Sequence, residues 1–337
     1  MARLTLSRAV ATTARNWLDL CHRADDLDLA GVSGADVAGS DAFVDAALAA
    51  AATRKTQVGV LIALPTRSPL QTAVAAANLL AVTGPGRFSL GLGPGSPMVN
   101  EDGHGVPFGP PLARLRDYVT AISAILRAPA GAPIRHAGQY YRAAGMGYGF
   151  SPEQLPIVIG ASGPKMIALA TEIADGLGLH LLTARTVLRQ RVAQVRSVRT
   201  GTFPISAGVL TSVHDDLGEA LRRARLEVAA ALSFPRFLPR LAELTGDNLA
   251  ARFGAAVRAG DPASAAALLD DSVVREFAIV SRPETLRAQA ASLDFIETIA
   301  PVPVGQFCQF VPALGLTAGE WRDSQARVAA ALVPNTP

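Results

Sequence analysis

Short apolar runs alternate with segments of helical periodicity along most of the chain. This alternation is typical of repeated strand–helix units around a parallel sheet. Eight strands are predicted, at Arg3–Ser7, Leu29–Ser33, Gln57–Ala63, Phe88–Gly91, Pro156–Gly160, Gly176–Leu182, Ile205–Val213 and Asp294–Ile299. Eight strands in a chain of 337 residues favour an α/β fold, a single (β/α)8 TIM barrel over residues 1–337.

Four helices are indicated by the residues at their starts. Ser68-Pro69 combines a capping hydroxyl with a proline at the first helical position, and this helix is expected to reach about Ala81. Pro110-Pro111, Gly163-Pro164 and Arg282-Pro283 each precede a segment with apolar residues at helical spacing. These signals fix where the helices begin better than where they end.

Two stretches interrupt the alternation. Residues 129–155 surround a glycine with β-prone residues and predict a hairpin or an irregular insertion. Residues 234–276 are alanine-rich and helical, with several Gly and Pro breaks. They predict a helical insertion after the seventh strand, where barrels carry loops that shape the active site. No linker indicates a second domain.

Composition and charge narrow the classes of function. The net charge is only +3, and the densest basic stretch, Arg185–Arg199, has no aromatic residue on which a base could stack, so nucleic-acid binding is not expected. The longest uncharged helical stretch, Ser68–Gly86, contains Pro, Gln and Asn and does not predict a membrane span. Cys21 and Cys308 lack metal-ligand spacing, and no metal is expected. We therefore expect a soluble, cytoplasmic protein.

The segment 156–176 carries the clearest chemical signal. A buried strand runs into the turn Gly160-Ala161-Ser162-Gly163, and Pro164 then starts a helix. The first amides of that helix, expected to be those of Lys165, Met166 and Ile167, lack partners within the helix and favour an anion such as phosphate. An ordinary strand–helix turn explains the same Gly and Pro residues.

A second glycine-dense loop follows the fourth strand, within residues 86–105. Gly91, Gly93 and Gly95 resemble a dinucleotide fingerprint, but a proline and a loop follow where a helix is required. We interpret these glycines as allowing the close approach of a flat ring or a sugar chain. Asn100 and His104, further along, are exposed loop residues by default.

Two further polar residues lie at the ends of predicted strands. Asp36 follows the second strand, where an aspartate is as often a helix cap as a ligand. His180 lies in the apolar sixth strand, where a hydrogen-bonded core histidine is the more common case. No catalytic triad, carboxylate pair or metal cluster stands out.

Taken in order, GRFSLGLGPGS, GPPLARLRDYV, HAGQYY and PIVIGASGPKMIALATEIADG resemble the bacterial luciferase-like superfamily. Within it, GASGPKM followed by TEIADG is most similar to the deazaflavin branch that includes methylenetetrahydromethanopterin reductase. The resemblance is best from about Thr56 to Leu182. It implies an oxidoreductase that uses coenzyme F420, in which a hydride passes from the reduced deazaflavin to a C=N or C=C bond of a small molecule or biosynthetic intermediate.

The resemblance also implies the site residues. It makes Gly160, Ala161, Ser162, Gly163, Lys165 and Met166 the loop for the cofactor phosphate. It places a non-proline cis peptide at Val60-Leu61, behind the ring, a cofactor contact at Asn100, and Asp36 near the cofactor's side chain. The Arg185–Arg199 helix is a weaker candidate for attracting the cofactor's acidic tail.

One departure and two alternatives remain open. Sugar-phosphate dehydrogenases of this branch place a histidine after the aspartate of the second strand, but here Val37 follows Asp36, which leaves His104 and His180 as candidate proton donors. The alternatives are an FMN-dependent monooxygenase on the same barrel and a degenerate, non-catalytic barrel that serves as a binding subunit. By analogy with the superfamily, a homodimer is expected.

Overall fold

The computed structural model describes residues 3–8, 12–36, 39–150, 155–303 and 317–333. Its strands are β1 (Arg3–Ser7), β2 (Gly31–Gly34), β3 (Gln57–Ala63), β4 (Phe88–Leu92), β5 (Pro133–Ala137), β6 (Arg142–Met146), β7 (Ile157–Ala161), β8 (Gly176–Leu179), β9 (Ile205–Val213), β10 (Ala278–Ser281) and β11 (Thr298–Pro303). Its longer α-helices are α1 (Ala14–Asp26), α2 (Ala42–Ala52), α3 (Pro69–Thr83), α4 (Pro111–Arg127), α5 (Pro164–Ile173), α6 (Arg185–Val198), α7 (Leu217–Leu232), α8 (Leu238–Thr245), α9 (Asp247–Arg258) and α13 (Ala318–Leu332). Shorter helices are α10 (Pro262–Ala267), α11 (Asp271–Phe277), α12 (Leu286–Ala291), the 3₁₀-helix η3 (Pro283–Thr285) and the π-helix η1 (Met98–Gly103).

The main sheet confirms the predicted barrel. Its hydrogen-bonded order is β10-β9-β11-β1-β2-β3-β4-β7-β8, and β9 also pairs with β8. Since β11 pairs with both β9 and β1, eight strands form a closed ring, and β10 adds to the end of β9. The registers are parallel, as repeated strand–helix units require. The fold is a (β/α)8 barrel.

Two compact units make up the described chain, and each is described by itself. One contains residues 12–178 and 201–204, with α1–α5 and the strands β2–β7. The other contains residues 1–11, 179–200 and 205–337, with α6–α13, β1 and β9–β11. The organisation of the chain as a single domain stays a prediction.

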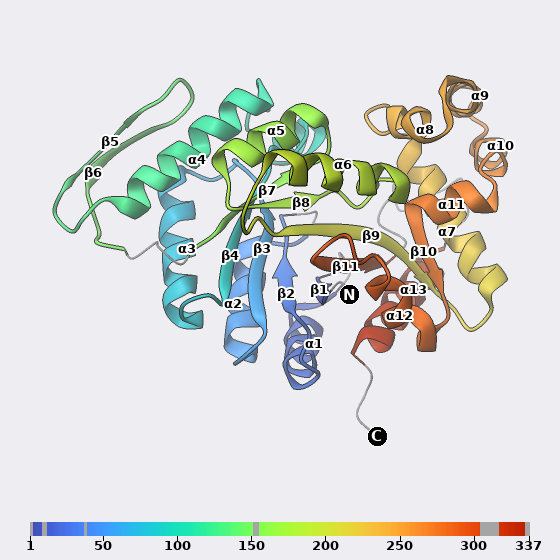
Figure 1. Ribbon diagram of the computed structural model, residues 1–337, viewed down its shortest axis with the longest axis horizontal. Helices are drawn as coiled ribbons and strands as arrows, with labels where there is room; N and C mark the ends of the chain where they lie inside the picture. The colour runs from blue at the N-terminus through green and yellow to red at the C-terminus, as the bar shows by residue number, and fades with distance from the viewer. Residues whose placement is uncertain (1–2, 9–11, 37–38, 151–154, 304–316, 334–337) are drawn as a thin grey trace. The chain divides into compact units, whose positions relative to one another are not determined.

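Helix starts in the first unit follow the sequence signals. Ser68 forms a capping box with Gln71 at the start of α3, which runs two residues further than expected. On α4, Leu115, Val119 and Ile122 are buried together, as their spacing predicts. The predicted insertion at 129–155 contains the antiparallel hairpin β5–β6, which lies beside α4 (Figure 1).

An aspartate on α4 anchors this hairpin. Asp117 accepts hydrogen bonds from the amides of Tyr140 and Tyr141 at 2.6 and 3.0 Å, and its other oxygen lies 2.6 Å from His136 Nε2. Gly138 is required at the turn because a Cβ there would lie 1.8 Å from the Asp117 carboxylate. The HAGQYY motif therefore has a structural explanation.

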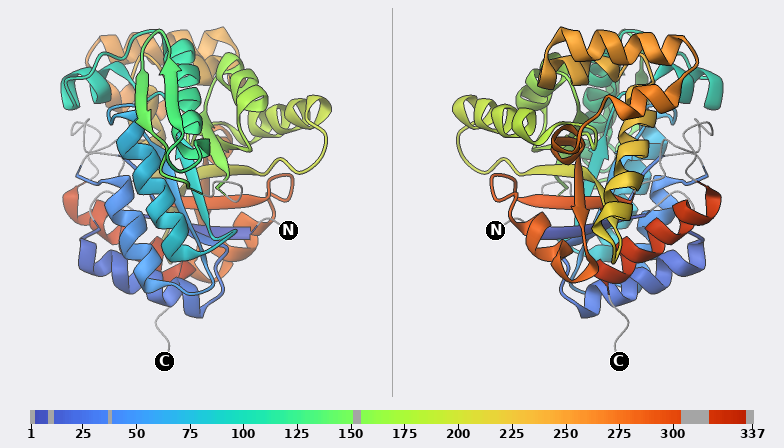
Figure 2. Two further views of the ribbon diagram at one scale, coloured as in Figure 1. Left: turned by 90° about the vertical axis from the view of Figure 1, so that its left-hand side faces the viewer. Right: turned by 90° about the vertical axis from the view of Figure 1, so that its right-hand side faces the viewer.

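In the second unit, the predicted helical insertion at 234–276 is confirmed as α8, α9, α10 and α11, and α8 packs against α9 (Figure 2). Alanines and Phe253 and Phe277 bury this insertion against α7. Gly254, expected to break a helix, lies inside α9. No helix in the described ranges is long and apolar enough to cross a membrane.

The predicted strand ends need three corrections. β2 begins at Gly31, two residues later than expected. β8 ends at Leu179, because the Leu182 amide leaves the sheet and donates to His180 Nδ1 at 3.2 Å. The strand expected at Asp294–Ile299 is β11, which overlaps that range only at its last two residues.

The last strands were the hardest to predict. β11 contains Pro301 and Pro303, whose missing N–H groups argue against a strand, so the prediction stopped short of them. β10 was missed altogether, because it follows α11 at Phe277 with no turn residue between the two elements.

Candidate functional site

The end of β3 is the point on which several predicted site residues converge. A non-proline cis peptide bond joins Leu61 to Ile62, one residue later than the Val60-Leu61 position predicted. The pairing of β3 with β4 shifts register between Val60 and Ala63, and this irregularity made counting from the sequence inexact. Val60 is buried, whereas Leu61 and Ile62 are partly exposed.

The neighbouring glycines make room for this segment. A Cβ at Gly91 would lie 2.4 Å from the Val60 carbonyl oxygen, and one at Gly93 would lie 2.2 Å from Ile62 Cδ1. A Cβ at Gly160 would lie 2.8 Å from Ile62 Cγ2. Close packing against residues of β3 therefore explains Gly91 and Gly93 without a bound group, and the approach of a ring or a sugar to this loop stays a prediction. Ile62 was not among the predicted site residues, although a side chain at Gly93 or Gly160 would displace it.

This packing predicts the effect of adding one methyl group to β4. Gly91→Ala is expected to lower the free energy of unfolding by about 2 kcal/mol, because the nearest atom is backbone that cannot rotate away. Urea unfolding measures the change. Gly163→Ala is the matched control, since a Cβ there meets nothing within 4 Å, and it should change stability by less than about 0.5 kcal/mol. Equal effects of the two variants would refute the packing argument.

Asp36 holds the same segment from the other side. Its amide donates to the Ile62 carbonyl at 2.9 Å, and its Oδ2 accepts from the Leu64 amide at 3.0 Å. Its Oδ1 accepts from the amide of Ala42, the first residue of α2, at 2.9 Å. Both carboxylate oxygens therefore have a structural task. The N-cap of α2 is Asp41, and Asp36 adds an acceptor for the first amide of that helix. The place of Asp36 near a cofactor stays a prediction.

Asn100 is buried, contrary to the default expectation for this loop. It lies in η1 with 1% of its surface exposed. Its Oδ1 accepts from the Ser96 amide at 3.1 Å, and its Nδ2 donates to the Pro94 carbonyl at 3.1 Å. Gly95 has a φ of +75°, and a Cβ there would lie 2.0 Å from Asn100 Oδ1. Asn100 thus shapes the glycine loop, and its contact with a cofactor stays a prediction.

His104 lies on the same loop and is exposed. It follows the last residue of η1, and its amide donates to the carbonyl of Glu101. The structure gives this side chain no buried partner among the described residues. Its role as a proton donor stays a prediction.

The predicted phosphate loop lies between β7 and α5. Gly163 precedes the first turn, Pro164 contributes no N–H, and Lys165 is exposed. Within the described part of the chain, neither the amide nor the ammonium group of Lys165 has a protein partner. Space is also open at Gly163, where a Cβ would meet nothing within 4 Å. An anion therefore fits beside Gly163 and Lys165.

Fewer backbone amides are free at this turn than the three that the sequence predicts. The amides of Met166 and Ile167 both donate to the Gly163 carbonyl, at 3.1 and 3.0 Å. The side chains of Ala161 and Met166 are buried. The Met166 amide is therefore not free for a phosphate, and the open part of the loop consists of the exposed or partly exposed residues Ser162, Gly163 and Lys165. Roles of Gly160 and Ala161 at the cofactor phosphate stay predictions. Gly160 serves the packing against Ile62.

His180 belongs to the second unit and directly follows β8. Its Nδ1 accepts from the Leu182 amide at 3.2 Å and lies 3.0 Å from Nη1 of Arg240 on α8. Since both partners are donors, the ring proton lies on Nε2. Burial, together with the charges of Arg240 and Arg236, lowers the pKa of His180 well below its usual value. His180 is therefore neutral at pH 7. No local pattern indicates its arginine partner, which lies 60 residues away in the chain.

Comparisons with known proteins agree with this fold. The chain is 34% identical over 180 residues to a Mycobacterium tuberculosis protein provisionally named a coenzyme F420-dependent oxidoreductase, an alignment that spans about half of each protein, 49% of this chain and 51% of that one. It is 28% identical over 267 residues to the 5,10-methylenetetrahydromethanopterin reductase of Archaeoglobus fulgidus, covering 75% of this chain and 79% of the reductase.

A solved structure and a family profile complete the comparison. The coenzyme F420-dependent tetrahydromethanopterin reductase of Methanopyrus kandleri superposes with a TM-score of 0.73 at 21% identity, over 98% of each chain. The profile of the family described as luciferase-like monooxygenase matches residues 2–295. A match over this much of the sequence, together with the closed parallel barrel, shows that the chain belongs to the luciferase-like monooxygenase family.

Proposed function

We propose that this protein is a coenzyme F420-dependent oxidoreductase that reduces a C=N or C=C bond of a small molecule. The observation that carries the proposal is the start of α5, where open space at Gly163 lies beside Lys165, which has no ion-pair partner among the described residues. The relatives whose names include F420 supply the choice of cofactor. A homodimer and a cytoplasmic location are part of the same proposal, by analogy alone.

The residues at the start of α5 fit the phosphate of such a cofactor. Lys165 supplies a full positive charge, and the amides of Gly163 and Lys165 lie at the positive end of the helix dipole. When bound, reduced F420 supplies a hydride and reacts poorly with oxygen. The protein's share of the reaction is then to bind the cofactor, orient it and exclude water.

The other predicted residues hold the backbone around the site in place. Asp36, Gly91 and Gly93 fix the Leu61–Ile62 segment, and Asn100 fixes the adjoining loop. His180, neutral and protonated on Nε2, is suited to donating a hydrogen bond and is a poor source of a proton. Exposed His104 is left as the other candidate proton donor.

Fluorescence titration with F420 tests the proposal. Lys165→Ala is expected to weaken F420 binding at least tenfold, because a charge-assisted contact with phosphate is lost. The matched control is Lys55→Ala, which removes the only other lysine; Lys55 pairs with exposed Asp28 and should leave the affinity unchanged. Equal affinities of the wild type and Lys165→Ala would contradict the phosphate loop.

The FMN-dependent monooxygenase is kept as the second candidate, because the same lysine and open turn suit the phosphate of FMN. A parallel titration with FMN separates the two. Tighter binding of FMN, together with oxygen consumption in the presence of substrate, would replace the reductase by the monooxygenase. Binding of neither cofactor would leave the non-catalytic barrel as the explanation.

A further inference from the structure

Three nitrogen-containing side chains of the second unit surround one buried aromatic ring. Phe237 has 6% of its surface exposed and lies just before α8. The guanidinium carbons of Arg236 and Arg240 lie 4.5 and 4.8 Å from the centre of its ring, and the imidazole of His180 is centred 5.3 Å away. The cluster of His180, Arg236 and Arg240 therefore joins the end of β8 to the start of α8.

The two arginines of this cluster have no acidic partner among the residues that the structure describes. Arg240 donates to His180 Nδ1 and to the Leu182 carbonyl, both of them neutral groups. The acid nearest in sequence, Glu243 on the same helix, is held by Arg191 of α6 through two contacts of 2.7 and 2.8 Å. Glu243 acts on Arg240 only through its charge and not through a contact, so the two positive charges lie near one ring with no described carboxylate in direct contact with either.

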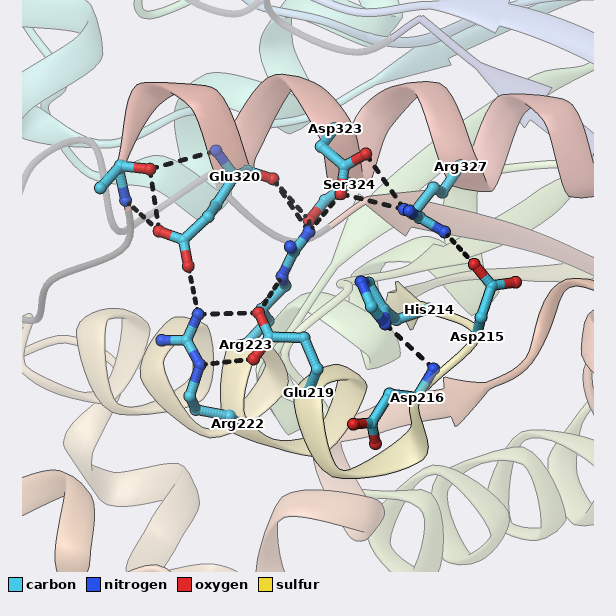
Figure 3. A network of polar contacts seen from close by, with 11 residues as sticks. His214, Asp215, Asp216, Glu219, Arg222, Arg223, Glu320, Asp323, Ser324 and Arg327 are labelled. Atoms are coloured by element: carbon cyan, nitrogen blue, oxygen red, sulfur yellow. Dashed lines mark hydrogen bonds and ion pairs between the residues drawn. The ribbon is translucent and has the colours of Figure 1, made fainter.

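Other arginines of this unit, in contrast, are paired with acids. Arg222, Arg223 and Arg327, on α7 and α13, all contact carboxylates, and these contacts raise their pKa values above the usual range (Figure 3). At the cluster, partial desolvation lowers the pKa of Arg236, although much of its side chain is exposed, and burial followed by the charge of Arg191 lowers the pKa of Arg240 to about 10, against the charge of Glu243 that raises it. Both arginines remain charged at pH 7, and an anion would offset the free-energy cost of placing them together.

We propose that His180, Arg236 and Arg240 bind a carboxylate or phosphate group of the substrate. The three side chains offer donors only, since the two guanidinium groups and the Nε2–H of His180 have no acceptor function in this arrangement. In a barrel, residues at the carboxyl ends of the strands bind the substrate, and His180 stands directly after β8. The substrate assignment rests on the proposed oxidoreductase function, whereas binding of an anion by the cluster does not.

Calorimetric titration with inorganic phosphate at low ionic strength tests the site. Arg240→Gln and Arg236→Gln are each expected to weaken phosphate binding at least tenfold. Arg252→Gln, which removes an exposed arginine of α9, is the matched control and should bind as the wild type does. Arg236 is exposed, so its variant keeps the test valid even where Arg240→Gln fails to fold, as judged by circular dichroism.

One further variant shows at which of the two candidate sites the phosphate binds. Lys165→Ala removes phosphate binding at the α5 turn and should retain the binding that Arg240→Gln removes. The proposal is overturned where both cluster variants bind phosphate like the wild type, or where Lys165→Ala alone abolishes binding.

Titration with F420 separates the substrate from the cofactor. Arg240→Gln and Arg236→Gln are expected to keep the wild-type affinity for F420 within twofold. A tenfold loss would assign the cluster to the acidic tail of the cofactor and overturn the substrate assignment. Failure of every form to bind F420 would refute the proposed function, while the phosphate titration would still decide whether the cluster is an anion site.

Discussion

Replacing Arg223 with methionine is expected to lower the free energy of unfolding by about 4 kcal/mol. The Arg223 side chain is 8% exposed and lies between two acids, with Nε 2.6 Å from Glu219 and Nη1 2.6 Å from Asp323 (Figure 3). The same Nη1 lies 3.3 Å from the hydroxyl of buried Ser324. Without the guanidinium, α7 and α13 would face each other through carboxylates that have lost a common partner.

The neighbouring arginine supplies the control for this prediction. Arg222 contacts the same Glu219, at 2.8 Å, but its side chain is 42% exposed. Arg222→Met should therefore cost about 1 kcal/mol or less, since solvent screens an exposed pair. Chemical denaturation of both variants measures the difference, and equal losses would show that burial of Arg223 does not govern the strength of the network.

Acid should weaken the same network. The hydrogen bond from Arg222, followed by that from Arg223, lowers the pKa of Glu219 to about 2, against the burial that raises it. A carboxyl whose pKa is lower in the folded state stabilises the fold above its ordinary pKa of 4.5, and this contribution disappears as the pH falls toward 2.

The second large effect is expected at Asp25, at the end of α1. Asp25 is 4% exposed, and its carboxylate accepts from the amides of Arg54, Lys55 and Thr56 at 2.8–3.0 Å. Burial raises the pKa of Asp25, but these amides outweigh it and lower the pKa to about 2. Asp25→Ala should lower the free energy of unfolding by about 3 kcal/mol, since it leaves three backbone donors without their acceptor.

The dependence on pH distinguishes this contribution from packing. About 2 kcal/mol of it comes from the lowered pKa; it is complete above pH 3.8 and declines as the pH falls toward 2. The stability difference between the wild type and Asp25→Ala, measured by urea unfolding from pH 7 to pH 3, should shrink accordingly. Asp28→Asn, at an exposed residue three positions further along, is the control and should change stability little. A difference that stayed constant with pH would refute the electrostatic explanation.

The barrel could be predicted from the sequence because its signals are local. Apolar runs mark the strands, and Ser68, the paired prolines and Gly163 mark the helix starts, each within a few residues. Local signals predicted neither β10 nor the full extent of β11. One has no turn before it, and the other owes its place to pairing with β9 in spite of two prolines.

The candidate site was predicted less completely, because its contacts join residues far apart in the chain. The resemblance placed the cis bond within one residue, but nothing in the sequence indicated that Ile62 would fill the space beside Gly93 and Gly160. Likewise, the donors that surround His180 come from α8 and from its own turn, and periodicity carries no information about them.

Asp36 and Lys165 differ in what they can reveal about relatives of this protein. The carboxylate of Asp36 accepts hydrogen bonds from two backbone amides of the barrel itself. A homologue that had lost all activity would therefore still be under selection to keep this aspartate. Lys165 makes no hydrogen bond or ion pair with another described residue, so the fold does not depend on its charge. A lineage that gave up the cofactor would be free to discard this lysine first, so the residue at this position, rather than the aspartate, should separate working enzymes from inherited scaffolds.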